Sequence, residues 1–416
     1  MSRYVIIGSG IAGVTAAETI RRLDPDGTIT IYNGEPFPFY FRAAMAFYIK
    51  GMISEDDLYG KPSYWAKDHR IRILGEKAVQ VHPFEREVVG QNGIVELYDK
   101  LLIATGSWPF VSPWPGKDLD GVMTYRSLMC ARKTVDYIKK YKVKSAAIIG
   151  GGILGVEFAE NFQNLGIKTT IIAIEERLME LLFDKEASSL IEEQMRADGV
   201  ELKLGAVTEG LSGKDGRVDG VILKDDVKVD ADLVGVAIGV LPHVEFLENS
   251  GLEIDSRGLV VDERLRTSDE AIWGAGDVSV RKIGENYFPC RTWLTAAEQG
   301  RQAGVNMTGT GEPFVEKVFF NASHVYKSLY AVIGSFKAPE EPPFEHVKLN
   351  TPEGEYAKLI LENGKLVGAM FVGGVAPVWD VFNAIAEGRD VDIDKVSGWR
   401  GHRLSRALNG APPTLF

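Results

Sequence analysis

Gly8-Ser9-Gly10-Ile11-Ala12-Gly13 follows the short apolar run 3–7 and precedes residues 14–23, which have helical character, and a second apolar run at 28–32. Strand, G-x-G-x-x-G turn, helix and strand in this order form a dinucleotide-binding βαβ unit. The first glycine permits the tight turn, the second lets a pyrophosphate approach the backbone, and the third lets helix and strand pack closely. The unpaired N–H groups at the start of the helix attract phosphates.

The same pattern returns about 140 residues later, near the middle of the chain. Gly150-Gly151-Gly152-Ile153-Leu154-Gly155 lies between the apolar run 146–149 and the helical stretch 156–165, with the next strand predicted at 169–174. One such motif is weak, because a glycine-rich turn need not bind a ligand. Two copies, each placed between strand and helix, predict an α/β protein with two Rossmann-like domains.

Prolines and glycines mark three connectors, at 108–115, near Leu241-Pro242, and at 309–313. The sequence changes after the third connector. Apolar runs at 359–361 and 366–370 flank Glu362-Asn363-Gly364-Lys365, which predicts a β-hairpin with a type I′ turn. We therefore expect a smaller α+β C-terminal domain over residues 313–416.

Composition excludes several classes of protein. With 45% hydrophobic and 25% charged residues over 416 positions, the chain suits a soluble enzyme of two to three domains. The net charge of −11 disfavours nucleic-acid binding, and the apolar runs are too short to span a membrane. No signal peptide is evident, so a cytoplasmic protein is expected. The two cysteines, Cys130 and Cys290, are far apart and the six histidines are scattered, so no metal site is expected.

Two further segments carry a resemblance to a known family. Residues 98–106 form an apolar strand that ends in Ala-Thr-Gly, and residues 271–277 form a strand that ends in Gly-Ala-Gly-Asp. With both glycine turns, these segments resemble the pyridine nucleotide-disulfide oxidoreductases, and the resemblance covers the whole chain in order. It implies that FAD is bound by the first turn, the Ala-Thr-Gly strand and the aspartate, at Gly8, Gly10, Gly13, Thr105, Gly106 and Asp277. For Asp277 a helix N-cap is a compatible alternative reading.

The resemblance assigns the second turn to the nicotinamide dinucleotide, through Gly150, Gly152, Gly155 and the family glutamate present as Glu157. It also implies a discontinuous FAD-binding domain, residues 1–112 and 243–312, with an NAD(P)-binding domain, residues 113–242, inserted into it. The C-terminal domain, residues 313–416, would then be an interface domain, in a homodimer or a hetero-complex.

The chain departs from the thiol-dependent branches of this family. It has no CxxC or CxxxxC pair, and the single redox cysteine of the peroxidase, oxidase and coenzyme A-disulfide branches aligns with Ala43. Electrons must therefore pass from the flavin directly to an acceptor. Residues 29–36 and 40–42 look most like the FAD domain of the nitrite reductase large subunit and the rubredoxin-reductase-like relatives. The ferredoxin-reductase branch is less favoured, because it usually has a lysine where Phe47 stands.

Further FAD contacts are expected at Asn33, Glu35, Arg42 and Trp293. Asn33 stands where the family has an acid that binds the FAD ribose, and an asparagine can still hydrogen-bond a ribose hydroxyl, with Glu35 close by. For Trp293, ordinary core packing is the alternative. The aromatic run 37–41 either walls the FAD site or packs in the core.

The choice between NADH and NADPH depends on the end of the second strand of the middle βαβ unit. Ala173 stands where the family usually has an acid. That acid accepts a hydrogen bond from the 2′-hydroxyl of NAD and repels the 2′-phosphate of NADP. Only Arg177 could favour a 2′-phosphate, and Glu175 and Glu176 would oppose it. We therefore expect NADH, bound through Glu175. In the alternative, Glu175 and Glu176 are solvated loop residues.

The expected activity is hydride transfer from NAD(P)H to FAD, followed by electron transfer to a rubredoxin- or ferredoxin-like carrier or a partner subunit. The rival hypothesis is a flavin electron-transfer subunit of a larger redox complex that does not itself turn over nicotinamide, which the loss of the acid at Ala173 favours. Two basic segments suit an acidic carrier, residues 132–144 and the cluster Arg400, His402, Arg403 and Arg406. The C-terminal cluster is favoured, because lysines on an exposed helix, as in the first segment, are usually just solvated. In the alternative, the C-terminal cluster lies in a homodimer interface.

Overall fold

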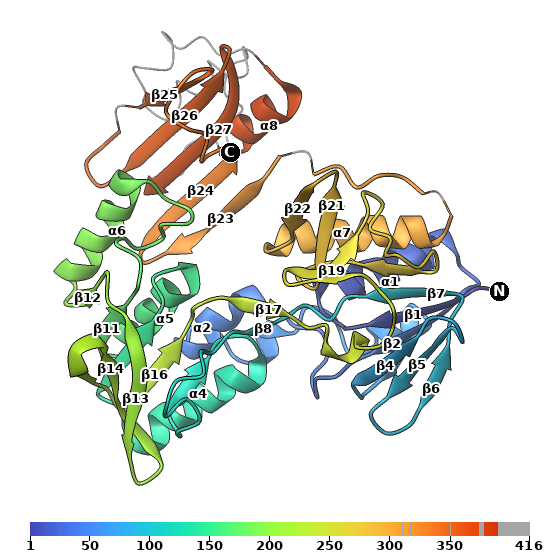
Figure 1. The fold of residues 1–416 in the computed structure, drawn as a ribbon, viewed down its shortest axis with the longest axis horizontal. Coiled ribbons are helices and arrows are strands. Elements are labelled where there is room, and N and C mark those ends of the chain that lie inside the picture. Colours follow the sequence, from blue (N-terminus) through green and yellow to red (C-terminus); the bar gives the residue numbers. More distant parts are fainter. Residues whose placement is uncertain (310, 317, 350, 374–377, 390–416) are drawn as a thin grey trace. The chain divides into compact units, whose positions relative to one another are not determined.

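The structure is a computed structural model that describes residues 1–309, 311–316, 318–349, 351–373 and 378–389. The chain forms two compact units (Figure 1). Unit 1 contains residues 1–110 and 239–315, and unit 2 contains residues 111–238 and the described part of 316–416. The basic cluster at Arg400, His402, Arg403 and Arg406 lies outside the described residues.

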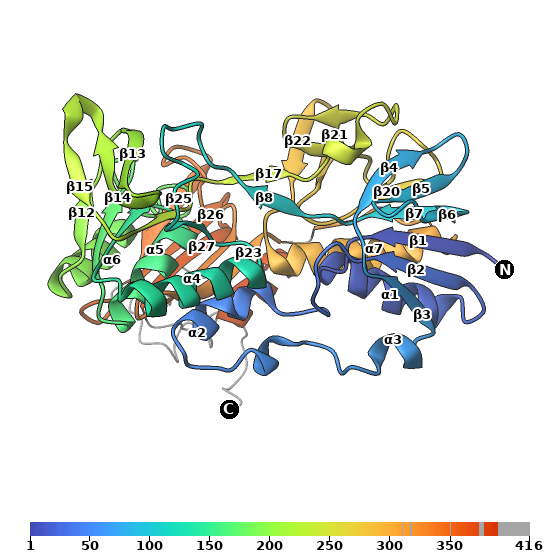
Figure 2. The same ribbon diagram turned by 90° about the horizontal axis from the view of Figure 1, so that it is seen from below.

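Unit 1 is built on a parallel five-stranded sheet in the order β20-β7-β1-β2-β3. Apolar side chains alternate between its two faces, so both faces are buried. One face packs under helices α1 and α7. The other packs under the antiparallel meander β4-β5-β6 (Figure 2). The strands are β20 (Ile272–Gly274), β7 (Lys100–Ile103), β1 (Arg3–Ile7), β2 (Thr28–Tyr32), β3 (Ile71–Leu74), β4 (Ala78–His82), β5 (Glu87–Gly90) and β6 (Val95–Leu97).

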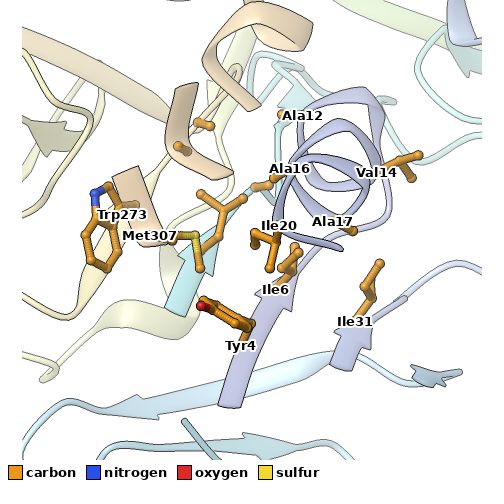
Figure 3. Close-up of a cluster of buried hydrophobic side chains, with 14 of the residues drawn as sticks. Tyr4, Ile6, Ala12, Val14, Ala16, Ala17, Ile20, Ile31, Trp273 and Met307 are labelled. Carbon is orange, nitrogen blue, oxygen red and sulfur yellow. The ribbon is translucent and has the colours of Figure 1, made fainter. Parts of the chain in front are cut away.

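Helices α1 (Ile11–Leu23) and α7 (Trp293–Met307) pack closely because small residues line their contact. A methyl group on Gly300 would lie 2.2 Å from the carbonyl oxygen of Ala12, so only glycine allows this approach. Figure 3 shows Ala16 and Ile20 of α1 in the buried cluster with Ile6 of the sheet. This packing fixes the N-terminal end of α1 over the carboxyl end of β1.

The rest of unit 1 consists of a small sheet, a two-stranded ribbon and short helices. The ribbon pairs β8 (Ser107–Pro109) with β17 (Val240–Pro242), so the segments that leave and re-enter unit 1 run side by side. The small sheet has the order β18-β19-β21-β22, with strands β18 (Ile254–Asp255), β19 (Gly258–Val261), β21 (Ser279–Ile283) and β22 (Asn286–Pro289). The short helices are η1 (Arg42–Ala44), α2 (Met45–Ile49), η2 (Asp56–Leu58), α3 (Trp65–Asp68) and η4 (Glu245–Leu247).

Unit 2 repeats the parallel architecture in the order β12-β11-β10-β16-β9. A three-stranded antiparallel sheet, β13-β14-β15, packs on it. The elements are β9 (Val122–Thr124), α4 (Leu128–Tyr141), β10 (Ser145–Ile149), α5 (Ile153–Asn164), β11 (Lys168–Ile172), α6 (Lys185–Ala197), β12 (Glu201–Lys203), β13 (Thr208–Lys214), β14 (Arg217–Leu223), η3 (Lys224–Asp226), β15 (Lys228–Asp230) and β16 (Leu233–Val236).

The C-terminal part of unit 2 is an antiparallel sheet in the order β23-β24-β27-β26-β25, with α8 (Val378–Glu387) on one face. Asn363 and Gly364 both have positive φ, at 51° and 79°, and connect paired Glu362 and Lys365, which confirms the predicted type I′ hairpin. The strands are β23 (Phe320–Val325), β24 (Ser328–Gly334), β25 (Phe344–Lys348), β26 (Tyr356–Glu362) and β27 (Lys365–Gly373). The predicted fold class, two Rossmann-like sheets with a smaller α+β domain, is confirmed.

The C-terminal sheet contacts helix α6 through a buried ion pair. Asp184, the N-cap of α6, accepts hydrogen bonds from Lys358 and Tyr356, each at 2.6 Å. The Lys358 side chain is 4% exposed, so loss of this carboxylate would leave the ammonium group buried without an ionic partner. Burial raises the pKa of Asp184, but the bonds from Lys358 and Tyr356 outweigh it and leave the pKa below its usual value. Lys327 binds Asp198 just past the other end of the helix.

Within the described residues, no helix is long and apolar enough to cross a membrane. The same residues contain no group of three or more histidine, cysteine, aspartate or glutamate side chains that could hold a metal ion.

Candidate dinucleotide sites

The first glycine turn has the backbone that its sequence predicts. Gly8 has φ +110°, and a methyl group there would lie 2.3 Å from the carbonyl oxygen of Ala104. A methyl group on Gly13 would lie 2.0 Å from the carbonyl oxygen of Gly8. Gly10 differs, because nothing lies within 4 Å of the position its Cβ would take. Gly10 is the N-cap of α1 and offers no side chain to the first amides of the helix, so the space beside it suits a phosphate.

The end of β2 is joined to this turn by a buried polar contact. The Ser9 hydroxyl donates a hydrogen bond to Oδ1 of Asn33 at 2.7 Å, and Nδ2 of Asn33 donates to the carbonyl oxygen of Phe37 at 2.8 Å. Asn33 is 9% exposed. The amide therefore holds the turn and the following loop together, and its oxygen also accepts a bond from the backbone N–H of Glu35.

Glu35 and Arg42 lie together in a half-buried ionic cluster. Glu35 accepts hydrogen bonds from Nη2 of Arg42 at 2.5 Å and from the Tyr40 hydroxyl at 2.6 Å. Arg42 also contacts the Tyr40 hydroxyl directly. These three residues, with Ser9, Gly10 and Asn33, line one pocket, so the structure brings four of the predicted FAD contacts to one place.

The aromatic run after β2 is partly core and partly surface. Phe37 and Phe39 are buried, whereas Phe41 is 41% exposed. Trp293, the first residue of α7, packs against Phe39 and Phe41, with ring centroids 6.1 and 5.9 Å apart. Trp293 therefore packs on this aromatic run, at the partly buried edge of the core of unit 1.

Asp277 follows β20 and lies beside the Ala-Thr-Gly segment that follows β7. Its carboxylate accepts a hydrogen bond from the Ser107 hydroxyl at 2.9 Å. Strand β21 follows at Ser279, and α7 is capped by Thr292, so Asp277 does not cap a helix. Its backbone neighbour Gly276 has φ +80°.

Thr105 and Gly106 form hydrogen bonds with His243, in the segment where the chain returns to unit 1. The Thr105 hydroxyl donates to the carbonyl oxygen of His243 at 2.8 Å, and the His243 N–H donates to the carbonyl oxygen of Gly106 at 3.0 Å. Gln299 of α7, which the sequence did not single out, accepts a bond from the Gly276 N–H at 2.9 Å. Gln299 is 1% exposed, and no local motif in the sequence marks it.

The second glycine turn repeats the constraints of the first. Gly150 has φ +120°, and a methyl group there would lie 2.2 Å from the carbonyl oxygen of Ala237. A methyl group on Gly155 would lie 2.0 Å from the carbonyl oxygen of Gly150. At Gly152, the N-cap of α5, nothing lies within 4 Å of the Cβ position. This turn also leaves open space where a pyrophosphate would approach.

The loop after β11 places an acid beside this turn. Ala173 is 1% exposed, and its methyl group packs on Gly151. Oε2 of Glu175 lies 3.8 Å from the Cβ position of Gly151, whereas the Glu176 carboxylate lies beside Gly205. Arg177 pairs with Glu180 at 3.1 Å. Glu175 therefore lies beside the turn, and Arg177 is engaged by Glu180.

Glu157, in the first turns of α5, is half-buried near two tyrosines of unit 2. Burial and then the Glu157 charge raise the pKa of Tyr125 and of Tyr330 well above the usual value. Tyr330 belongs to β24 of the C-terminal sheet. The C-terminal sheet thus contributes a side chain to the surroundings of Glu157.

The two thiols are in different units. Cys290 is buried in unit 1, and Cys130 lies in unit 2 near the start of α4. Burial raises the pKa of the Cys130 thiol, but hydrogen bonds from Ser127 and Thr124 outweigh it, so the pKa lies below the usual value. Ala43 lies in the short helix η1 and is exposed.

Comparison with known proteins agrees with this geometry. The family model for pyridine nucleotide-disulphide oxidoreductases matches residues 2–300. The chain is 30% identical to nitrite reductase [NAD(P)H] of Bacillus subtilis over 95% of its own length and 48% of that protein. It is 28% identical to the assimilatory nitrate reductase electron transfer subunit of the same organism, over 94% and 50%. The chain thus spans about half the length of these two relatives.

Two further matches have other names. Rubredoxin-NAD(+) reductase of Pseudomonas putida is 30% identical over 74% of this chain and 80% of that protein. The solved structure of a ferredoxin reductase from Rhodopseudomonas palustris has a TM-score of 0.89, covers 98% of this chain and all of its own, and is 23% identical, which supports the fold. The open glycine turns fit the FAD and NAD(P)H that this family binds. The chain belongs to the pyridine nucleotide-disulphide oxidoreductase family and lacks its paired redox cysteines.

Proposed function

We propose that this chain is an NAD(P)H-dependent FAD oxidoreductase that passes electrons directly to a carrier protein or partner subunit, without a redox-active cysteine. The observation that carries the proposal is the pair of open glycine turns, at Gly10 and Gly152, in one chain whose family position for the redox cysteine is Ala43. Two turns can hold two dinucleotides. Alanine cannot accept electrons.

In this proposal the FAD-binding domain is residues 1–112 and 243–312, and the NAD(P)-binding domain is residues 113–242. Residues 313–416 act as an interface domain. The ion pair between Lys358 and Asp184 ties the C-terminal sheet to α6, so this sheet can support the nicotinamide domain as well as contact a partner.

The residues of unit 1 bind and orient FAD. Gly10 and the first amides of α1 hold the pyrophosphate, and Asp277, fixed by Ser107, accepts hydrogen bonds from the ribityl region. The Asn33, Glu35 and Arg42 group lines the pocket near the ribose. Bound FAD accepts a hydride and can release its two electrons singly. Glu157 is proposed to orient the nicotinamide.

NADH is the proposed donor. The Glu175 carboxylate lies beside the second glycine turn, where it can accept the 2′-hydroxyl of NADH. A 2′-phosphate would meet the charges of Glu175 and Glu176, and Arg177 is paired with Glu180. Charge repulsion therefore disfavours NADPH.

The proposed acceptor is a rubredoxin- or ferredoxin-like protein, because relatives carry those carriers in their names. A basic surface on α4 suits such an acidic partner. Arg132, Lys133, Lys139 and Lys140 are exposed there, and Lys142 and Lys144 follow the helix, all in a chain of net charge −11.

The test is anaerobic addition of NADH or NADPH to the FAD-loaded protein, followed by the visible absorption of the flavin. NADH should bleach the flavin within seconds, and NADPH more slowly. Dithionite is the control, because it reduces a bound flavin whether or not the second turn binds nicotinamide. Bleaching by dithionite alone would contradict the proposed activity.

A second candidate function is a flavin electron-transfer subunit that does not turn over nicotinamide. The replacement of the usual acid by Ala173 favours it, as does the relative named an electron transfer subunit. The same titration separates the two, since this subunit would bleach only with dithionite or a reduced partner protein.

A further inference from the structure

Unit 1 has a cavity at the end of its parallel sheet opposite the glycine turn. The cavity has a volume of about 460 Å³ and lies where β1, β2 and β3 begin. Strands rise about 3.3 Å per residue, so the length of β1 separates Arg3 from the turn by about 13 Å. The cavity is therefore distinct from the proposed FAD site, and it is within the usual size range of a small-molecule site.

Positive charge dominates the lining of this cavity. Four arginines from three segments of unit 1 line it, whereas Asp26 and Glu96 are the only acids in the lining. The arginines are Arg3, Arg21, Arg70 and Arg72. This excess of guanidinium groups is unusual in a chain of net charge −11 and indicates an anionic ligand.

Two of the four guanidinium groups have no carboxylate partner within the described residues. Arg21 donates to five carbonyl oxygens, among them those of His69 and Arg70, and forms no ion pair there. Arg70 donates to the carbonyl oxygen of Pro25 at 2.6 Å. Burial and then the nearby Arg70 charge lower the pKa of Arg21. The two cations thus repel each other, and a bound anion would relieve this.

The other two arginines form ion pairs but keep exposed guanidinium groups. Arg72 pairs with Glu96 at 2.9 Å and its side chain is 57% exposed, and Arg3 pairs with Asp99 at 2.8 Å with 46% exposed. Each guanidinium group has five N–H donors, so an exposed one can keep its carboxylate partner and still donate to a ligand.

Apolar groups complete the wall. Met1 and Leu97, which are both exposed, line the cavity together with the arginines. A free inorganic ion would leave this surface without a partner, whereas a ligand with an apolar body would cover it. Several guanidinium groups favour a phosphate over a single carboxylate, because its three oxygens accept from more than one arginine.

The structure assigns to this cavity a binding site for a small phosphate ester with an apolar or aromatic body, held by Arg70 and Arg72 with Arg21 behind them. The assignment does not depend on the proposed redox function. The cavity lies at the other end of the sheet, and only the binding of a phosphate ester tests the assignment.

The experiment is isothermal titration of phenyl phosphate into the protein saturated with FAD and NAD⁺, which occupies both dinucleotide sites without reducing the flavin. Phenyl phosphate should bind, and phenol should bind at least about tenfold more weakly because it lacks the charge. Arg70→Gln/Arg72→Gln should weaken phenyl phosphate by about tenfold or more, since it removes charged hydrogen bonds.

Arg22→Gln is the matched control, because Arg22 is an exposed arginine on α1 outside the cavity lining, and it should change the affinity by less than about twofold. Thermal unfolding without ligand checks the fold of each variant. Should the double variant unfold, exposed Arg72→Gln alone carries the test. Absence of binding to the wild type, or equal binding by wild type and folded variants, would overturn the assignment.

Discussion

The two glycine turns have nearly the same backbone but different partners at the end of the next strand. A methyl group on the first glycine would lie 2.3 Å from Ala104 O in one turn and 2.2 Å from Ala237 O in the other. In the first turn, Ser9 hydrogen-bonds Asn33, whereas in the second, Gly151 packs on the methyl group of Ala173. The glycines thus specify a phosphate-binding backbone, and the strand-end residue distinguishes one dinucleotide site from the other.

Substitution of the open glycine in each turn should give the largest difference between the functions of the two turns. Gly10→Val should abolish FAD binding and give colourless protein, whereas Gly152→Val should remain yellow and lose reduction by NADH by a hundredfold or more, roughly 3 kcal/mol. Both side chains would enter empty space, so both variants should fold. FAD content and the anaerobic bleaching rate check the outcome. Yellow Gly10→Val with normal FAD content would disprove the first assignment.

An acid placed at the second strand end should harm the fold. Ala173→Asp would bury a carboxylate beneath Gly151, at a position 1% exposed, and should lower the free energy of unfolding by about 2–4 kcal/mol. Ile174→Asp is the control, because Ile174 is 67% exposed. Urea unfolding measures both. A stable Ala173→Asp protein with faster NADH oxidation would mean that this position still accepts the acid of the family.

Removal of the charge beside the second turn should change cofactor preference. Glu175→Gln should lower kcat/KM for NADH by about tenfold, or about 1.4 kcal/mol, and should not lower it for NADPH. Glu176→Gln serves as the control, because that carboxylate lies beside Gly205. Steady-state rates with an artificial dye give both values. An unchanged ratio of the two cofactors in Glu175→Gln would exclude Glu175 from the site.

The bond between turn and strand end in unit 1 should have a smaller effect. Ser9→Ala leaves Oδ1 of Asn33 without the serine hydroxyl and should cost about 1 kcal/mol of stability, with weaker FAD retention. Ser54→Ala removes an exposed hydroxyl elsewhere in unit 1 and is the control. Thermal unfolding and FAD release during gel filtration measure the difference. If both variants behave alike, the Ser9–Asn33 bond does not stabilise the turn.

The smallest effect is expected from the two thiols, one in each unit. Cys130→Ser/Cys290→Ser should reduce an artificial one-electron dye within about twofold of the wild type, since no electron passes through sulfur. The dye rate per bound FAD is the measurement. A loss beyond about tenfold with FAD retained would restore a thiol to the mechanism.

Local sequence was enough to predict the βαβ units and the hairpin. Each depends on residues close in the chain. Gly8, Asn363 and Gly364 have φ values that only certain residues adopt readily, and Gly13 lies too close to the carbonyl oxygen of Gly8 for a side chain. Four of the six glycines that the two motifs name, Gly8, Gly13, Gly150 and Gly155, are positions where an added methyl group would strike backbone.

Contacts over long sequence separations could not be predicted. Ser107 and Asp277 are 170 positions apart, and Asp184 at the start of α6 meets Lys358 of the C-terminal sheet. No local sequence pattern predicts either contact, because serine and lysine side chains are also common on protein surfaces. The same holds for the cavity at Arg70 and Arg72, where four arginines look like ordinary surface charge until the strands pair.

Because β8 and β17 pair with each other, the chain leaves and re-enters unit 1 at neighbouring positions. The Phe110 N–H donates to the carbonyl oxygen of Gly239 at 2.9 Å, so the two ends of the excursion into unit 2 are neighbours in space. A gene that encoded the chain without residues 111–238 would join two residues that are already hydrogen-bonded to each other. Residues 111–238 can therefore be deleted, or replaced by another domain, without stretching the chain of unit 1 that remains.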